Sequence, residues 1–381
     1  MDQETKISSR SPRGLFYCQP VLGSGHLMRS LYLSRALIQF FDIDFFYGGS
    51  GSLPFVLPPP FQLLQLPPLH IKDDSSLKTL VDPTGLTTVE EVFLKRALFL
   101  RKRADVFYDF IITEMYPFSK AVFGDEVDKI LAAAKRVNPR CQVICSFKGI
   151  SLSFPPEEEL FILKKIHADY DLILSHTDPH LFRFEHFFLS TAAIMEKVFY
   201  TGFVSNPAPL QNPLRKKQIV VTFGGGAYGE VLPLAISRVV PFFPDYKFIF
   251  ALGPKAPDHL KKELANLKYP NMEVTSFLVD FYKVLEESAL SISLGGSTLI
   301  DTVKTKTPAL VYPDINKEHF LRAKLFYDWG ALQVIRHADL TPNRLQAIIK
   351  KVLMSPYNPR AIEVSGAEQS TLRIRKLLGL T

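Results

Sequence analysis

The sequence predicts an α/β protein made of two doubly wound domains that face a central cleft. Short apolar runs bounded by glycine or proline alternate with amphipathic segments, which is typical of parallel βαβ units with helices on both sheet faces. The chain has 381 residues, a length that suits two domains better than one core. Hydrophobic residues make up 47% of it, which excludes a disordered chain.

The N-terminal half contains the first series of elements. Strands are expected at residues 14–21, 43–47, 110–113, 142–146, 172–175 and 198–200. Helices are expected at residues 26–39, 92–105, 125–137 and 157–168. Helical segments between successive strands supply the crossovers that parallel pairing requires.

A proline-rich segment separates this series from a second one. Residues 204–217 hold three prolines and no periodic apolar face, so we interpret residues 206–217 as the linker. The domains are then residues 1–205 and 218–381, and the last helix could pack back on the N-terminal domain. Strands of the second series are expected at residues 219–223, 247–252, 274–277, 290–293 and 309–312. Helices are expected at residues 231–242, 257–267, 281–288 and after residue 297.

Charge and composition limit the partners and the location. The formal net charge of +7 favours anionic partners such as nucleotide diphosphates or acidic lipids. No nucleic-acid partner is expected, because the basic residues are dispersed and no recognition module is visible. Three unpaired cysteines and the lack of a long apolar run predict a cytoplasmic protein. The aromatic regions 40–46 and 53–69 leave a peripheral contact with the inner face of the membrane open.

The first candidate site follows the first strand, where Gly23, Ser24 and Gly25 precede His26. Glycines let a backbone approach a ligand closely, and free N–H groups at a helix start favour negative charge. A neutral imidazole at His26 could accept a proton. A histidine that only packs at the helix start is an equal alternative, so both interpretations stay open here.

Glu114 stands at the carboxyl end of a later strand. The carboxyl ends of parallel strands meet at the ligand-binding edge of such a sheet. The carboxylate could therefore act as a general base, orient one, or bind an acceptor. A solvated loop carboxylate is the alternative.

Two glycine-rich turns follow strands in the C-terminal half. The first is Gly224-Gly225-Gly226, a pattern typical of phosphate cradles and equally of tight turns. The second runs from Gly295 through Gly296 and Ser297 to Thr298, where backbone amides and hydroxyls at a helix start suit a diphosphate.

Asp301 follows Thr298 by one helical turn and would share its face. It could accept hydrogen bonds from ribose hydroxyls. Alternatively, it only complements the helix dipole.

Taken in order, these pieces resemble the family-28-type GT-B glycosyltransferases, a superfamily that includes the peptidoglycan lipid II N-acetylglucosaminyltransferase. Within it, the chain is most similar to a bacterial group of predicted glycosyltransferases. The resemblance covers nearly the whole chain. Its motifs are FYxQ with GxGHLxR (16–29), LPPL (66–69), VDxxG (81–85), ITExxPF (112–118), DP (178–179), YTGxV (200–204) and VVxxGGG (220–226).

The resemblance implies the GT-B fold and an inverting, metal-independent transfer of a hexosyl or N-acetylhexosaminyl group, without a cofactor. The implied donor is a nucleotide-diphosphate sugar, with a UDP-sugar expected, and the acceptor is a small molecule, a glycan or a lipid-linked group. The general base is His26 or Glu114, and an acceptor or phosphate loop contains Gly23, Ser24, Gly25 and Arg29. The implied donor-binding residues are Gly224, Gly225, Gly226, Phe277, Leu278, Gly295, Gly296, Ser297, Thr298, Asp301, Glu318, His319 and Arg322.

Some residues depart from the family pattern. Asp301 replaces a glutamate, His319 a glutamine and Lys306 a glycine. Two other functions stay open. One is a UDP-sugar 2-epimerase of the same fold, which needs several carboxylates in the cleft. The other is a nucleotide-sugar-binding protein without catalysis.

Overall fold

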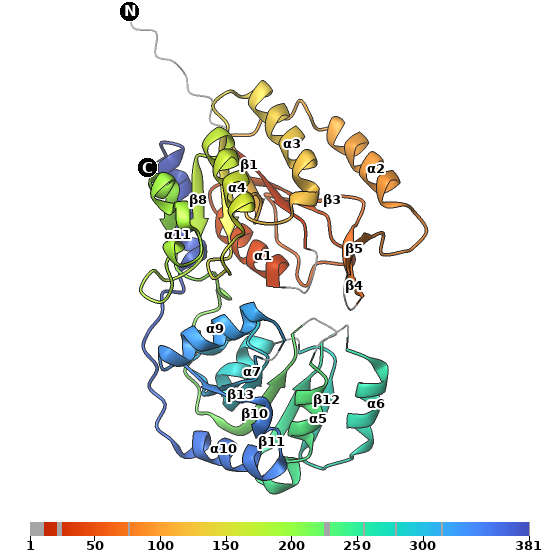
Figure 1. Ribbon diagram of the computed structural model, residues 1–381, viewed down its shortest axis with the longest axis vertical. Helices are drawn as coiled ribbons and strands as arrows, with labels where there is room; N and C mark the ends of the chain where they lie inside the picture. Colours follow the sequence, from red (N-terminus) through yellow and green to blue (C-terminus); the bar gives the residue numbers. More distant parts are fainter. Residues whose placement is uncertain are drawn as a thin grey trace, which may run out of the picture.

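The computed structural model describes residues 11–20, 25–74, 77–224, 229–253, 256–278, 280–313 and 315–380. Two α/β domains lie one above the other along the long axis of the molecule (Figure 1). The predicted fold class is therefore confirmed. Four predicted site residues, Gly23, Ser24, Gly225 and Gly226, lie outside the described residues.

The N-terminal domain is built on a seven-stranded sheet with the order β3-β2-β1-β6-β7-β8-β9, and its neighbouring strands pair in parallel. The strands are β1 (Arg13–Cys18), β2 (Asp42–Tyr47), β3 (Phe61–Gln65), β6 (Phe110–Glu114), β7 (Gln142–Phe147), β8 (Leu172–Ser175) and β9 (Val198–Tyr200). The helices are α1 (Gly25–Leu37), α2 (Val89–Arg101), α3 (Gly124–Val137) and α4 (Pro156–Asp169). A separate antiparallel hairpin, β4 (His70–Asp74) with β5 (Leu77–Val81), was not predicted.

The strands are buried on both faces, which explains their nearly continuous apolar sequences. In β1, Leu15 and Tyr17 pack into the core beneath α3 and α4, whereas Phe16 and Cys18 pack into the core beneath α1. This alternation follows from the two-residue period of a strand.

The C-terminal domain repeats the plan with a six-stranded parallel sheet in the order β12-β11-β10-β13-β14-β15. Its strands are β10 (Lys216–Thr222), β11 (Lys247–Ala251), β12 (Met272–Thr275), β13 (Ser288–Ser293), β14 (Ala309–Val311) and β15 (Gln333–Val334). Its helices are α5 (Val231–Ser237), α6 (Asp258–Asn266), α7 (Phe281–Glu287), α8 (Thr298–Lys304), α9 (Lys317–Asp328) and α10 (Pro342–Met354).

The chain passes between the domains twice. The segment after β9 leads into the C-terminal domain, and the segment after α10 leads back. The two passages run side by side: Phe203 N donates to Glu363 O at 2.7 Å, and Gly366 N donates to Phe203 O at 3.0 Å. A Cβ atom on Gly366 would lie 2.5 Å from Gly202 O, so this close approach requires glycine.

The last helix, α11 (Gly366–Leu377), lies on the N-terminal domain against α1 (Figure 1). Ile374 is fully buried there in the same core as Leu31 of α1. The chain thus ends on the domain that contains β1.

Of the two aromatic regions that left a membrane contact open, residues 40–46 are largely internal, whereas residues 53–69 are partly exposed, with Val56 and Leu63 at 89% and 43% exposure. Phe41, Phe45 and Phe46 are buried, and the ring of Phe40 lies under the guanidinium of Arg375, 4.3 Å from the ring centroid. In the region 53–69, Leu57, Leu64, Leu66 and Leu69 are buried. Of the described helices, none combines the length and apolar character needed to cross a bilayer.

We predict that Ile374→Ala lowers the free energy of unfolding by about 2–5 kcal/mol, because it leaves a cavity between α11 and α1. The measurement is urea unfolding followed by far-UV circular dichroism. Leu372→Ala in the same helix is the control: Leu372 is 52% exposed, so a change within about 0.5 kcal/mol is expected. Equal effects of the two substitutions would contradict the docking of α11.

Candidate active site

The two domains approach each other at the starts of α1 and α8. A Cβ atom on Gly25, the first residue of α1, would lie 2.8 Å from Ser297 Oγ, just before α8. Both helices follow the carboxyl ends of strands, where open α/β sheets bind ligands. The candidates predicted in the two halves of the chain therefore face one cleft.

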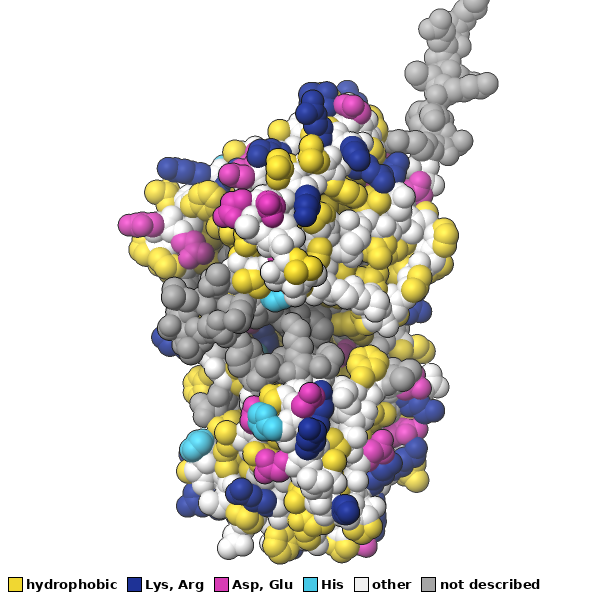
Figure 2. All heavy atoms as spheres, turned by 90° about the vertical axis from the view of Figure 1, so that its right-hand side faces the viewer, with side chains coloured by type: hydrophobic (Ala, Val, Ile, Leu, Met, Phe, Trp, Pro, Cys, Tyr) yellow, Lys and Arg dark blue, Asp and Glu magenta, His cyan; other side chains and the backbone are white. Residues whose placement is uncertain are grey.

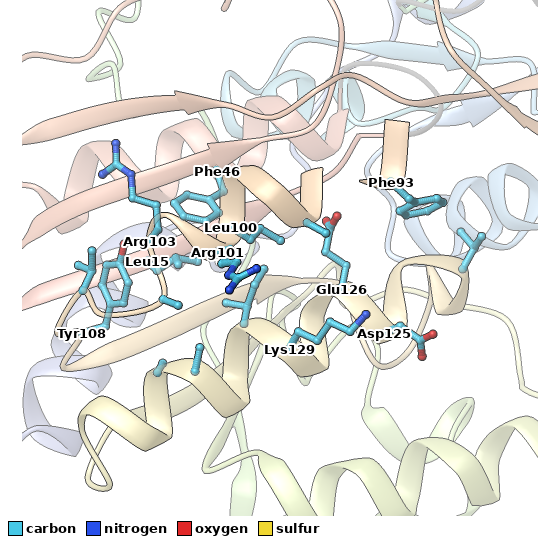
Figure 3. A pocket seen from close by; sticks show the side chains of 17 residues that line it. Leu15, Phe46, Phe93, Leu100, Arg101, Arg103, Tyr108, Asp125, Glu126 and Lys129 are labelled. Atoms are coloured by element: carbon cyan, nitrogen blue, oxygen red, sulfur yellow. The ribbon is translucent and has the colours of Figure 1, made fainter. Parts of the chain in front are cut away.

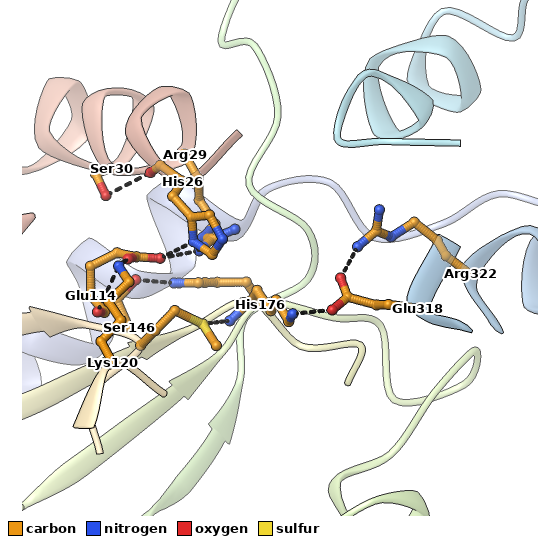
Figure 4. A network of polar contacts seen from close by, with 11 residues as sticks. His26, Arg29, Ser30, Glu114, Lys120, Ser146, His176, Glu318 and Arg322 are labelled. Atoms are coloured by element: carbon orange, nitrogen blue, oxygen red, sulfur yellow. Dashed lines mark hydrogen bonds and ion pairs between the residues drawn. The ribbon is translucent and has the colours of Figure 1, made fainter. Parts of the chain in front are cut away.

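A buried carboxylate, Glu114, is the centre of the N-terminal side of this cleft. It ends β6 and its side chain is fully buried. His26 Nδ1 lies 2.6 Å and Arg29 Nη2 2.5 Å from its Oε1, while Lys120 Nζ donates to its Oε2 (Figure 4). The structure thus joins His26 and Glu114, which the sequence offered as rival bases.

Local structure explains how these groups converge. His26 and Arg29 are three residues apart in α1 and so share one face. Met115 and Lys120 both adopt left-handed backbone conformations, with φ of 70° and 66°. Such conformations cost about 1–3 kcal/mol each outside glycine and are typical of functional sites. The turn that they shape brings Lys120 back onto Glu114.

The charges around Glu114 decide its protonation and that of His26. Burial alone would raise the pKa of Glu114, but His26, Lys120 and Arg29 outweigh it and hold that pKa well below its usual range. Burial lowers the pKa of His26, aided by Lys120 and Arg29 and opposed by Glu114. The imidazole is therefore neutral at pH 7. Because an ionised carboxylate only accepts hydrogen bonds, Nδ1 carries the proton and Nε2 has a free lone pair.

On the opposite side, the first turns of α9 hold the loop that follows β13. Glu318 Oε1 accepts from Arg322 Nη2 at 2.7 Å, and Arg322 Nη1 donates to Gly295 O at 3.0 Å. His319 Nδ1 lies 3.0 Å from Leu294 O. Gly295 has a φ of 74°. A Cβ atom there would lie 2.8 Å from Val311 Cγ1, so both its conformation and its surroundings require glycine.

Asp301 is placed differently from what its predicted ribose contact suggests. Its Oδ1 accepts from the backbone N–H of Asn206, at the start of the linker, at 3.0 Å. Burial raises the pKa of Asp301 to about 6, opposed by that hydrogen bond and by Lys304. Lys304 Nζ donates to Asn206 O as well. In this structure Asp301 fastens the linker to α8.

The remaining predicted donor residues surround the same edge. Thr298 begins α8, one turn before Asp301. Phe277 is exposed, and its backbone N–H and carbonyl both bond to Thr275 Oγ1. Gly224 is exposed with a φ of 63° at the end of β10.

Two lysines of the cleft were not predicted from the sequence. Lys120 has no signal in the sequence, because its position depends on the turn after β6. Lys148 immediately follows β7, so the strand-end argument that identified Glu114 could have found it. Lys148 Nζ donates to Glu318 Oε2 across the cleft.

Positive charge exceeds negative charge among the described residues of the cleft. Arg29, Lys120, Lys148 and Arg322 surround the two carboxylates, Glu114 and Glu318. Unbalanced charge in a largely buried site is unfavourable until an anion enters. Nε of Arg29 is also buried without a hydrogen-bond partner in the described chain, which costs about 1–3 kcal/mol. No three His, Cys, Asp or Glu side chains of the described ranges gather closely enough to hold a metal ion.

Comparison with known families identifies the C-terminal domain. Residues 219–374 match the model of the glycosyltransferase family 28 C-terminal domain. Two relatives share the name UDP-N-acetylglucosamine–N-acetylmuramyl-(pentapeptide) pyrophosphoryl-undecaprenol N-acetylglucosamine transferase. The protein from Carboxydothermus hydrogenoformans is 28% identical over 170 residues, which are 40% of this chain and 45% of the relative. The protein from Gloeothece citriformis is 29% identical over 351 residues, which are 87% of this chain and 85% of the relative.

Solved structures share the fold at low identity. The calicheamicin glycosyltransferase CalG4 is 14% identical with a TM-score of 0.56, over 97% of this chain and 94% of its own. A UDP-N-acetylglucosamine 2-epimerase is 15% identical with a TM-score of 0.59, over 97% and 95%. The chain therefore has the GT-B fold of two Rossmann-like domains, a fold that both kinds of enzyme use.

We predict that His26 titrates below its ordinary pKa of about 6.5. In Glu114→Gln the pKa should fall further, because the carboxylate that favours the imidazolium is gone. Histidine NMR titration measures both values. His176 is the internal control: it is buried with a pKa of about 3 and should stay neutral throughout. A pKa of His26 above 7 would contradict the prediction, because the imidazole would then be mostly protonated at pH 7.

Proposed function

We propose that this chain, whose C-terminal domain belongs to glycosyltransferase family 28, is an inverting, metal-independent glycosyltransferase. It transfers a sugar from a nucleotide-diphosphate donor, a UDP-sugar, to an acceptor hydroxyl. The observation that carries the proposal is the cleft itself. A neutral His26, bonded to Glu114, follows Gly25, which approaches Ser297 of the phosphate-type loop. Cations exceed carboxylates around this point. The names of the two relatives support the UDP-sugar donor.

The base is His26, and Glu114 orients it. Nε2 of a neutral imidazole can take the proton of the acceptor hydroxyl as its oxygen attacks the anomeric carbon. Glu114 holds the Nδ1–H tautomer and stabilises the imidazolium that forms. Glu114 itself is a poor base, because its low pKa and its bonds to His26, Arg29 and Lys120 oppose protonation.

The donor diphosphate lies at the loop from Gly295 to Thr298, where backbone amides and the Thr298 hydroxyl can donate to it. Arg322 supplies positive charge beside Gly295 O. The sugar hydroxyls face Glu318, and the ribose faces Asp301. Binding of the ribose therefore competes with the contact between Asp301 and the linker.

We predict that UDP and UDP-sugars raise the melting temperature of the wild-type protein, and that Thr298→Ala and Asp301→Ala remove this stabilisation. Both substitutions delete groups assigned to the nucleotide. His26→Ala should keep the stabilisation and lower turnover by about 10²–10⁴-fold, because a general base contributes to the transition state and not to donor binding. A thermal-shift titration and a labelled-sugar transfer assay give the two measurements.

Controls separate this function from its alternatives. Thr341→Ala, before α10 in the same domain, should leave the thermal shift unchanged. Incubation with donor alone tests the epimerase: an epimerised sugar formed without any acceptor would refute the transferase. Nucleotide binding with no transfer to any acceptor would instead indicate a binding protein.

We infer in addition that the acceptor is lipid-linked and that the N-terminal domain meets it at the membrane surface. A cavity of about 410 Å³ lies between α2 and α3. Its apolar wall includes Leu15, Phe46 and Leu100, and its rim includes Arg101 and Lys129 (Figure 3). Three basic residues, Arg101, Arg103 and Lys129, and two acidic ones, Asp125 and Glu126, line this cavity. An apolar cavity with such a basic excess suits the surface of an anionic bilayer. The undecaprenol in the names of the two relatives supports this class of acceptor.

The outer surface of α2 extends this pattern. Leu94 and Leu98 are 63% and 54% exposed, Lys95 lies on the same helix, and Lys102 caps its C-terminal end. Figure 2 shows Lys and Arg side chains interspersed with hydrophobic ones over the N-terminal domain. This face adds to the expected membrane contact of the region 53–69, where Val56 and Leu63 are exposed as well.

We predict that the protein floats with vesicles containing phosphatidylglycerol, and that added salt reduces the bound fraction because part of the attraction is electrostatic. The double variant Leu94→Asp with Leu98→Asp should bind at least about tenfold more weakly. Leu214→Asp is the matched control, because Leu214 is 93% exposed but lies in the linker. Equal binding by the double variant and the wild type would contradict the membrane role of α2.

A further inference from the structure

One ion pair among the described residues joins the two domains across the cleft, that of Lys148 with Glu318. Lys148 is held rigidly at its backbone. Its N–H lies 3.3 Å from Met115 Sδ, and the following Gly149 has a φ of 90°. A Cβ atom on Gly149 would lie 2.5 Å from His176 O. The base of the Lys148 side chain is therefore fixed, while its four-carbon stem can still move.

Glu318 links Lys148 to the loop where the proposed function places the diphosphate. Its Oε2 accepts from Lys148, and its Oε1 accepts from Arg322, which also bonds to Gly295 O. The ammonium of Lys148 thus lies one carboxylate away from the donor loop. It comes from the N-terminal domain, opposite the helix that carries Glu318.

We propose that Lys148 is a catalytic residue that stabilises the leaving nucleoside diphosphate from the N-terminal domain. Without donor it neutralises Glu318. When the donor binds, Glu318 turns to the sugar hydroxyls and the ammonium moves to an oxygen of the diphosphate. This inference rests on the proposed function and adds a second domain to the binding of the leaving group.

The reaction step balances without proton transfer by Lys148. The acceptor oxygen forms a bond to the anomeric carbon and loses its proton to His26 Nε2. The bond between the anomeric carbon and the diphosphate oxygen breaks, and its electron pair stays on that oxygen. Lys148 remains an ammonium and opposes the charge that develops there.

The other cations of the cleft are less free to play this part. Lys120 and Arg29 both donate to Glu114, which orients the general base His26. Arg322 donates to Glu318 and to Gly295 O. Among the residues that the structure describes, Lys148 has one ionic partner, Glu318. Burial lowers its pKa, opposed by Glu318, so an incoming anion stabilises its charge.

We predict that Lys148→Met lowers kcat for transfer by about 10²-fold and weakens UDP binding, with little change in the KM for the acceptor. A lysine that only blocks the donor site would give the opposite result, because removing it would free Glu318 and tighten UDP binding. Steady-state kinetics and calorimetric titration with UDP measure both effects. Unchanged kcat or tighter UDP binding in Lys148→Met would overturn the proposal.

A second comparison separates catalysis from support of Glu318. In a Glu318→Gln background the ion pair is already lost, so a purely structural Lys148 would have no further effect on kcat. We expect Lys148→Met to lower kcat there by a similar factor, and Lys148→Arg to restore most of the wild-type rate. Lys165→Met removes a surface ion pair of the same domain and is the control that should leave kcat unchanged. Loss of the effect in the Glu318→Gln background would reduce Lys148 to a positioning residue.

The proposed function and this inference fail in different ways. If the wild-type protein neither binds UDP nor transfers a sugar, the proposed function is wrong. If the wild-type protein is active and Lys148→Met is equally active, only the role of Lys148 is wrong.

Discussion

The arrangement of this cleft depends on one constraint, that the carboxylate of Glu114 is ionised without contact with water. Burying such a charge is costly unless partners neutralise it. The partners here are His26 and Arg29 of α1 and Lys120 from the turn after β6. His26 must present its Nδ1–H to the carboxylate. The strained turn at Met115 and Lys120 is tolerated because it supplies one of these partners. A reactive lone pair on the histidine is a consequence of satisfying the carboxylate.

On the other side of the cleft, Glu318 is a second carboxylate whose charge is neutralised by basic side chains. A carboxylate that accepts from both domains makes the electrostatics of the C-terminal side of the cleft depend on the position of the N-terminal side. Burial would raise the pKa of Glu318, but Lys148 and Arg322 lower it to about 2. The carboxylate of Glu318 is therefore ionised at pH 7. Lys148 and Glu318 thus couple the charge available to an anion to the relative position of the two domains.

The fold and several residues of the site could be predicted from the sequence because parallel sheets have a regular sequence pattern. Buried strands read as apolar runs, and side chains at their carboxyl ends, such as Glu114, face the ligand. The sequence could not show that His26 and Glu114 are partners, because their contact spans 88 residues. It could not place Lys120, whose direction depends on a left-handed residue, or Asp301, whose contact is with a linker backbone. The β4–β5 hairpin was missed because its two strands, HIKDD and LKTLV, interrupt their apolar residues with charged ones and form no continuous apolar run.

The return of the chain to its first domain changes how the molecule is divided. Since α11 packs on α1, the C-terminal domain forms an insertion between two neighbouring points of the N-terminal domain, Phe203 and Gly366. An insertion with adjacent ends can be exchanged as one block without rerouting the chain. The C-terminal domain can therefore be replaced as a unit, and its boundaries are the two paired backbone segments, of which the linker predicted at residues 206–217 adjoins only the first.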